Sequence, residues 1–232
     1  MILLIALVAG LLVWGGRALI TSSAFDVKSV TVKGASHLSA DDIRRIAGVA
    51  PGDSLTSVST GEIADKLKAE PWVASATVEK EYPDTVVISV KERRPIAIVD
   101  GGGTNLELVS DDLHWLGAPG TESTGTVVIR DVGDFKAVPG KRIEDEEIVN
   151  AIKVVAGMSP ELMADVRLVS ARSVEKTTLI TTGEIEIFVG EATRLDEKDE
   201  IIRQILEREA GKVVYINVRV VEEPAWRGLS DE

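Results

Sequence analysis

The first sixteen residues contain no charged side chain, and this feature constrains the fold more than any other. A helix needs about 20 apolar residues to cross a bilayer. Arg17 interrupts the run, but its side chain can extend to the headgroups, and three more apolar residues follow it. We therefore predict one transmembrane helix, with an indole near an interface. Its membrane-spanning residues are Ile2, Leu3, Leu4, Leu7, Leu11, Leu12, Trp14, Leu19 and Ile20.

A cleaved signal peptide is the alternative for this segment, because Ser22 and Ala24 are small enough to form a cleavage site. The basic residues that open a signal peptide are missing, which favours an uncleaved anchor over residues 1–24. The same absence means that the positive-inside rule gives no support for a cytoplasmic N-terminus. A start codon upstream of Met1 would explain it, and the N-terminal peptide of the native protein would decide the point.

Composition excludes several classes of function for the remaining part of the chain. About 200 residues follow the predicted anchor, enough for one or two domains with real cores. A net charge of −12 would repel nucleic acid. The absence of cysteine excludes disulfides and thiolate nucleophiles, and two histidines are too few for a multi-histidine metal site. We predict no catalytic residue, no metal and no cofactor.

Residues 25–94 predict a small domain with the order strand, helix, helix, strand, strand. Alternating β-branched residues at 27–33 indicate the first strand, and Gly34 ends it. Ser39 and Ser59 each have an acidic residue three positions later, a pattern typical of helix starts. Two further strands at 72–79 and 85–91 flank a Tyr-Pro-Asp turn and predict a hairpin.

Residues 95–223 predict a second domain of α+β class with a largely antiparallel sheet. Pro95 marks the boundary, and residues 224–232 are predicted to form a loose tail. The predicted helices span 143–158 and about 196–209. The predicted strands span 96–99, 106–109, 126–129, 166–170, 177–182, 184–189 and 212–221. A tight turn at Gly183 joins the strand at 177–182 to the strand at 184–189.

Several sequence motifs resemble those of one protein family. Phe25-x-Val27-x-x-Val30-x-Val32-x-Gly34, Pro71-Trp72-Val73-x-x-Ala76-x-Val78 and the stretch from Tyr82 to Pro95 resemble the POTRA domain of the FtsQ/DivIB family of bacterial cell-division proteins. Phe188-Val189-Gly190 and the stretch from Val213 to Arg219 resemble, more weakly, its β domain. Asn217 departs from the family's usual aspartate, and Asp111 to His114 from its Asp-x-x-Gly turn.

The resemblance implies a non-enzymatic divisome subunit in the cytoplasmic membrane, with most of the chain outside the cytoplasm and at the division septum. It implies FtsB- and FtsL-type partners, a role in septal wall synthesis, and a last strand that offers its edge to a partner strand. Trp226 is added as an anchor for a partner. The predicted partner-binding residues are Val213, Val214, Tyr215, Ile216, Asn217, Val218, Arg219, Val220, Val221, Glu222 and Trp226.

Two alternatives remain. Gly52-Asp53-Ser54-Leu55 matches the motif of GDSL esterases, and Asp111-x-x-His114 could supply a carboxylate and a base for Ser54. That fold needs a strand before the serine and a parallel sheet, whereas Pro51 and a short helix precede it here, so a turn is the better interpretation. The other alternative is a different POTRA-bearing membrane or secretion component.

Overall fold

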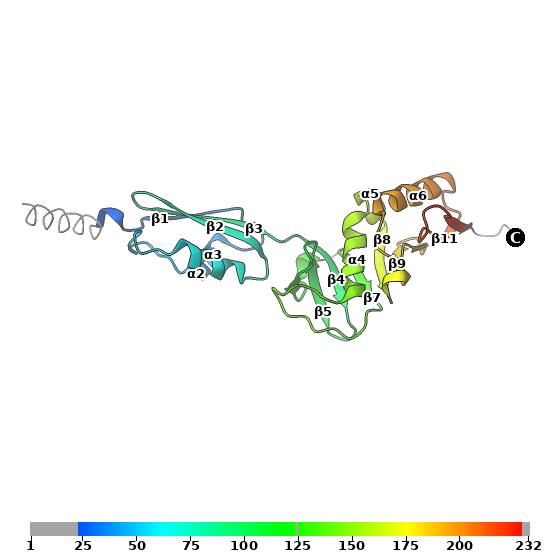
Figure 1. The fold of residues 1–232 in the computed structure, drawn as a ribbon, viewed down its shortest axis with the longest axis horizontal. Helices are drawn as coiled ribbons and strands as arrows, with labels where there is room; N and C mark the ends of the chain where they lie inside the picture. The colour runs from blue at the N-terminus through cyan, green and yellow to red at the C-terminus, as the bar shows by residue number, and fades with distance from the viewer. Residues whose placement is uncertain (1–22, 124, 229–232) are drawn as a thin grey trace, which may run out of the picture. The chain divides into compact units, whose positions relative to one another are not determined.

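The computed structural model describes residues 23–123 and 125–228, which belong to two compact units, Met1–Glu92 and Arg93–Glu232 (Figure 1). The predicted membrane span at 2–20 lies outside the described residues. Among the residues that are described, no helix has both the length and the apolar character needed to cross a membrane. Each unit is described separately below.

The first unit has the predicted order of one strand, two helices and two strands. Its sheet has the order β1-β3-β2, in which β1 runs parallel to β3 and β2 runs antiparallel to it. The hairpin predicted around the Tyr-Pro-Asp turn is therefore confirmed. The elements are the 3-10 helix η1 (Ser23–Phe25), β1 (Ser29–Lys33), α2 (Ala40–Ala47), α3 (Thr60–Lys68), β2 (Val73–Glu81) and β3 (Thr85–Glu92).

Local sequence signals explain most of this unit. The Ser39 hydroxyl accepts the Asp42 backbone N–H at 3.0 Å and caps α2, and Gly48 ends that helix in the left-handed region at φ 66°. Ser59 stands at the N-terminus of α3 but makes no capping side-chain bond. The helices pack on the sheet through fully buried apolar side chains such as Ile43 and Leu67.

The second unit contains nine strands in the order β12-β11-β10-β9-β8-β7-β4-β5-β6. Five neighbouring pairs are antiparallel and three are parallel, so the sheet is mixed where a largely antiparallel one was predicted. The strands are β4 (Pro95–Asp100), β5 (Leu106–Ser110), β6 (Trp115–Gly117), β7 (Val127–Arg130), β8 (Val166–Ala171), β9 (Thr177–Thr181), β10 (Glu186–Phe188), β11 (Val213–Asn217) and β12 (Ala225–Gly228).

Helices pack on one face of this sheet (Figure 1). Register places Leu179, Ile187 and Ile216 side by side on that face, and all three are fully buried. They join one core with residues of α4 and α6. The helical elements of the unit are η2 (Thr121–Ser123), α4 (Glu146–Gly157), α5 (Pro160–Met163), η3 (Val174–Lys176) and α6 (Leu195–Arg208).

The C-terminal strand was predicted wrongly. Instead of one strand over 212–221, β11 ends at Asn217, and β12 forms inside the predicted loose tail at 224–232. The Asn217 side-chain oxygen accepts the Arg219 backbone N–H at 3.2 Å, which turns the chain out of the strand. The Glu223 backbone N–H donates to Val220 at 3.2 Å and closes the turn, after which the chain returns antiparallel to β11.

Candidate functional site

The outer edge of β12 is the most distinctive surface of the second unit. β12 is the first strand of the sheet and pairs only with β11 among the described strands. Ala225, Trp226 and Arg227 are all exposed. An edge strand leaves backbone N–H and C=O groups available to a strand from another chain. The geometry therefore suits the binding of an extended segment.

The edge is not formed by the residues predicted for it. β11 lies between β10 and β12, so the backbone of Tyr215 to Asn217 already has a partner strand on both sides. Ile216 and Val218 are fully buried. Val220, at 54% exposure, lies in the following turn. The structure thus moves the free edge from the predicted strand to β12, and of the predicted residues Trp226 alone lies on β12.

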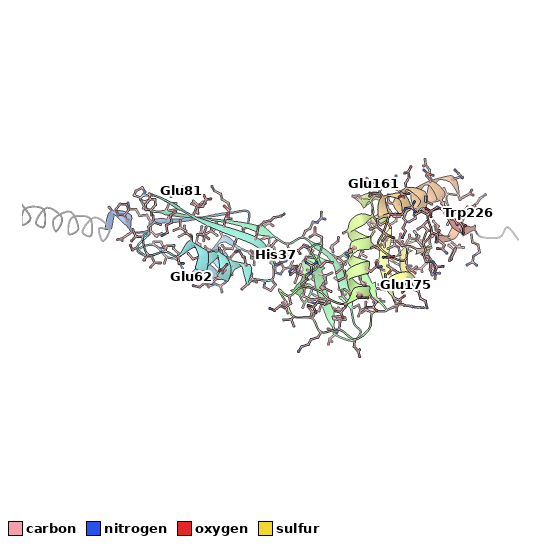
Figure 2. The ribbon with its side chains drawn as sticks, viewed as in Figure 1. His37, Glu62, Glu81, Glu161, Glu175 and Trp226 are labelled. Atoms are coloured by element: carbon pink, nitrogen blue, oxygen red, sulfur yellow. The ribbon has the colours of Figure 1, made fainter. Side chains whose placement is uncertain are left out.

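Trp226 borders a groove beside α6. Register places Trp226 opposite Ile216, so its side chain lies on the same face of the sheet as α6. Figure 2 shows Trp226 at the β12 end of the unit. The groove has a volume of about 260 Å³, and Trp226 is 45% exposed. The lining residues are Ile201, Gln204, Ile205, Arg208, Glu209, Pro224 and Trp226. A mixed lining of this kind suits an apolar side chain from a partner.

The opposite face of the same strands carries aromatic rings and arginines. The rings of Phe188 and Tyr215 have centroids 5.1 Å apart. The Arg219 guanidinium lies 5.8 Å from the Phe188 ring centroid, and that of Arg227 lies 5.2 Å from the Tyr215 centroid. Neither arginine forms an ion pair with any residue that the structure describes. Arg219 Nε donates to the Asn217 side-chain oxygen at 3.1 Å, but among the described residues neither charge is neutralised by a carboxylate, so both can attract one from a partner.

Buried polar contacts hold the segments behind this edge. The Lys198 ammonium of α6 is 2% exposed and donates to the backbone oxygens of Val189 at 2.9 Å and Glu191 at 2.7 Å. Burial lowers the pKa of Lys198. Arg194 pairs with Glu197 at 2.7 Å and with Glu222 in the turn before β12. These two hydrogen-bonded carboxylates raise the pKa of Arg194.

The residues of the esterase alternative each have other partners within their own unit. The Ser54 hydroxyl is hydrogen-bonded to the Thr56 hydroxyl at 2.9 Å. The Asp111 carboxylate pairs with Arg94 at 3.0 Å, and His114 Nδ1 lies 2.9 Å from the Asp112 backbone oxygen. A triad needs a carboxylate bonded to the base, and within the second unit Asp111 pairs with Arg94 instead of with His114.

No group of three or more histidine, aspartate or glutamate side chains in the described part of the chain is arranged to hold a metal ion. The acidic runs at 144–147 and 196–200 instead lie at or near the first turns of α4 and α6, where carboxylates suit the helix dipole.

The comparisons with known proteins agree with the architecture. Residues 25–93 match the family model described as "POTRA domain, FtsQ-type". The cell division protein FtsQ of Streptomyces venezuelae is 28% identical over 230 residues, covering 97% of this chain and 83% of its own. Residues 25–93 thus carry an FtsQ-type POTRA domain, and the chain is similar to FtsQ proteins along almost all of its length.

Two further FtsQ proteins extend the comparison. The cell division protein FtsQ of Mycobacterium leprae is 28% identical over 191 residues, or 82% of this chain and 53% of its own. That of Bradyrhizobium diazoefficiens is 38% identical over 96 residues, or 41% of this chain and 28% of its own. The chain thus spans about half of the length of the first of these relatives and less of the second.

Sequence patterns missed the parts of the candidate site that come from the C-terminal tail and from α6. Arg227 lies in a segment that was predicted to be loose, and Ile201 and Ile205 were predicted only as core residues of a helix. The signal that could have found β12 is Glu222-Glu223-Pro224, a turn-forming stretch followed by a tryptophan. A turn at this point places the next residues back against the preceding strand.

Proposed function

We propose that this FtsQ-family chain is a non-enzymatic scaffold of the bacterial divisome. Residues 2–20 anchor it in the cytoplasmic membrane, most of the chain lies outside the cytoplasm, and it acts at the division septum. There it binds FtsB- and FtsL-type membrane proteins and helps to assemble or regulate septal wall synthesis. The names of its relatives, all cell division proteins FtsQ, support this role.

The observation that carries the proposal is the open edge of β12 at the end of a nine-stranded sheet. A partner strand added there extends the sheet by backbone hydrogen bonds, which give affinity without requiring one particular sequence. The proposed docking strand is therefore residues 225–228, in place of the predicted residues 213–221, and Trp226 is still proposed as an anchor.

Side chains on the two faces next to β12 would select the partner. Successive residues of an added strand point to opposite faces of the sheet. Residues on one face would meet the groove beside Trp226, which takes an apolar side chain. Residues on the other face would meet Arg227, whose free guanidinium takes a carboxylate. The proposed partner segment is thus an extended strand with alternating apolar and acidic residues.

A complementation experiment tests the role and the site together. Cells are depleted of the native protein and supplied with a fluorescent fusion of the full chain. We expect depletion to give filamentous or branched cells, and the fusion to form a midcell band and restore division. Trp226→Ala should restore division poorly, whereas Val138→Ala should restore it fully, because Val138 is a similarly exposed apolar residue, at 41%, far from β12 in the sequence. A diffuse signal and normal division during depletion would overturn the proposal.

A further inference from the structure

Tyr82 is the most exposed large hydrophobic side chain in the described residues, at 63%. It lies in the turn between β2 and β3, next to Glu81, which Figure 2 labels at one end of the first unit. Its ring meets the edge of the Phe25 ring, with centroids 6.2 Å apart and planes at 79°. Two aromatic rings from distant parts of the sequence therefore form one small apolar tip, which we call the Tyr82–Phe25 tip.

The chain is fixed to the body of the unit from Phe25 onward. The Leu55 backbone N–H donates to Phe25 at 2.8 Å, and Val27 exchanges backbone hydrogen bonds with Asp53 and Gly52 at 2.7 and 2.8 Å. Lys28 pairs with Asp84 in the same turn as Tyr82, at 2.9 Å. These contacts fix the segment that follows the predicted anchor, and with it the tip, to the body of the first unit.

The predicted membrane span ends at about Ile20, five residues before Phe25. Five residues reach at most about 17 Å when fully extended. The headgroup layer on each side of the hydrocarbon core is itself about 5–8 Å thick. With Ile20 at the edge of the hydrocarbon core, Phe25 lies within the headgroup layer or at most about 12 Å beyond it. The headgroup layer is the region in which tyrosine is enriched in membrane proteins.

We propose that the Tyr82–Phe25 tip inserts into the headgroup layer of the membrane that holds the anchor, and that it fixes the orientation of the first unit on that membrane. The inference rests on the proposed anchor at residues 2–20. It adds a second, peripheral contact between the chain and the lipid. A tyrosine with its ring in the apolar boundary and its hydroxyl at the water suits this position better than it suits bulk water.

The charges beside the tip identify the kind of lipid surface that it fits. Lys28 and Lys80 stand against Asp26, Glu81 and Asp84, so the local charge nearly cancels. Asp84 is already neutralised by Lys28. Such a surface gains little from anionic lipid, and its contact with the membrane should depend weakly on salt. Zwitterionic phosphatidylcholine is therefore the probe of choice.

The absence of native cysteine makes a clean labelling experiment possible. A single cysteine at Glu81→Cys, next to an intact Tyr82, carries an environment-sensitive fluorophore on the full chain in phosphatidylcholine vesicles. The matched control is Ser75→Cys, an exposed position on β2 that lies seven residues from Tyr82, or roughly 23 Å along the strand. Lipids with a nitroxide at headgroup depth report whether each label lies in the headgroup layer.

We expect the headgroup quencher to reduce emission from the label at 81 about twofold and to leave the label at 75 nearly unchanged. Tyr82→Ser should remove most of the quenching at 81, and Tyr82→Trp should keep it, which separates a membrane role from a simple loss of folding. Equal quenching of the labels at positions 81 and 75, or quenching at position 81 that survives Tyr82→Ser, would overturn the inference.

Flotation with the vesicles after alkaline extraction distinguishes this failure from failure of the anchor. A chain that floats but shows no quenching at 81 retains its anchor and lacks the peripheral contact. A chain that does not float has no anchor of the proposed kind, and the inference about the tip then fails with it.

Discussion

The two units of this chain differ in what holds them together. Within residues 24–92, every fully buried side chain is apolar. The second unit also buries polar side chains, among them Asn150, Lys198 and Asp199. Several of these join segments that are about 40 residues apart in the sequence. The first unit is thus specified mainly by local signals and an apolar core, and the second also depends on long-range polar contacts.

This difference matters for function because the polar contacts lie behind the β12 edge. Asn150 of α4 binds the segment that connects β10 to α6, and Lys198 of α6 binds the same segment from the other side. A buried polar group that loses its partner costs free energy, so such contacts define one arrangement of the chain. The geometry of the edge is therefore set by contacts that no local pattern contains.

The largest effect on stability is expected at Asn150. Its amide nitrogen donates to the Thr177 hydroxyl at 2.8 Å and the Gly190 oxygen at 3.0 Å, and its oxygen accepts the Ala192 N–H at 2.8 Å. Asn150→Ala removes all three bonds, deprives the Gly190 oxygen and the Ala192 N–H of this partner, and should lower the free energy of unfolding by about 3 kcal/mol. Chemical denaturation of the full chain measures it.

Lys153→Ala on the exposed face of the same helix is the control, and it should change the free energy of unfolding by less than about 0.5 kcal/mol. A similarly small loss of unfolding free energy for Asn150→Ala would contradict this difference between the two units, because the second unit would then be held by its apolar core alone.

An intermediate effect is expected at Glu92, whose polar contacts within the first unit also join segments far apart in the sequence. Its carboxylate accepts the Ser36 hydroxyl at 2.6 Å and the His37 and Leu38 backbone N–H groups at 2.8 and 2.9 Å. Burial alone would raise the pKa of Glu92, but these hydrogen bonds outweigh it and hold the pKa below its usual range. Glu92→Gln should cost about 1–2 kcal/mol at neutral pH.

The pH dependence of this cost follows from the direction of the shift. Because the pKa of Glu92 is lower in the folded than in the unfolded chain, its stabilisation is complete above the unfolded pKa and is lost as the pH falls through the folded pKa. The difference in free energy of unfolding between the native chain and the Glu92→Gln variant should therefore shrink below about pH 4. A difference that stays constant down to pH 3 would contradict the assignment.

The smallest effects on stability are expected at two serines that stand at helix starts, and the two effects should differ. Ser39 caps α2 through the Asp42 N–H, and Ser59 makes no capping side-chain bond at α3. Ser39→Ala should lower the free energy of unfolding by about 1 kcal/mol, and Ser59→Ala by no more than a few tenths. Equal costs in thermal unfolding would show that the two sequence patterns, which look alike, act alike.

Sequence patterns predicted the first unit well because its determinants are local. The cap at Ser39, the stop at Gly48 and the alternation along β1 can each be recognised within ten residues of sequence. The mixed sheet of the second unit depends on which strands meet, and the parallel pairing of β10 with β11 is set by packing around α6. For the candidate site, the sequence pointed to Trp226, whose role in partner binding stays a prediction, but it did not point to the turn at Asn217 that creates a new edge.

The central claim is that β12 is the partner-binding edge, and site-specific photocrosslinking in dividing cells tests it most directly. A photoreactive amino acid replaces Arg227 on β12 or, as the control, Val138, which is also exposed. We predict an adduct with a membrane division protein from position 227 and none from position 138. No adduct from 227, or the same adducts from both positions, would contradict the account.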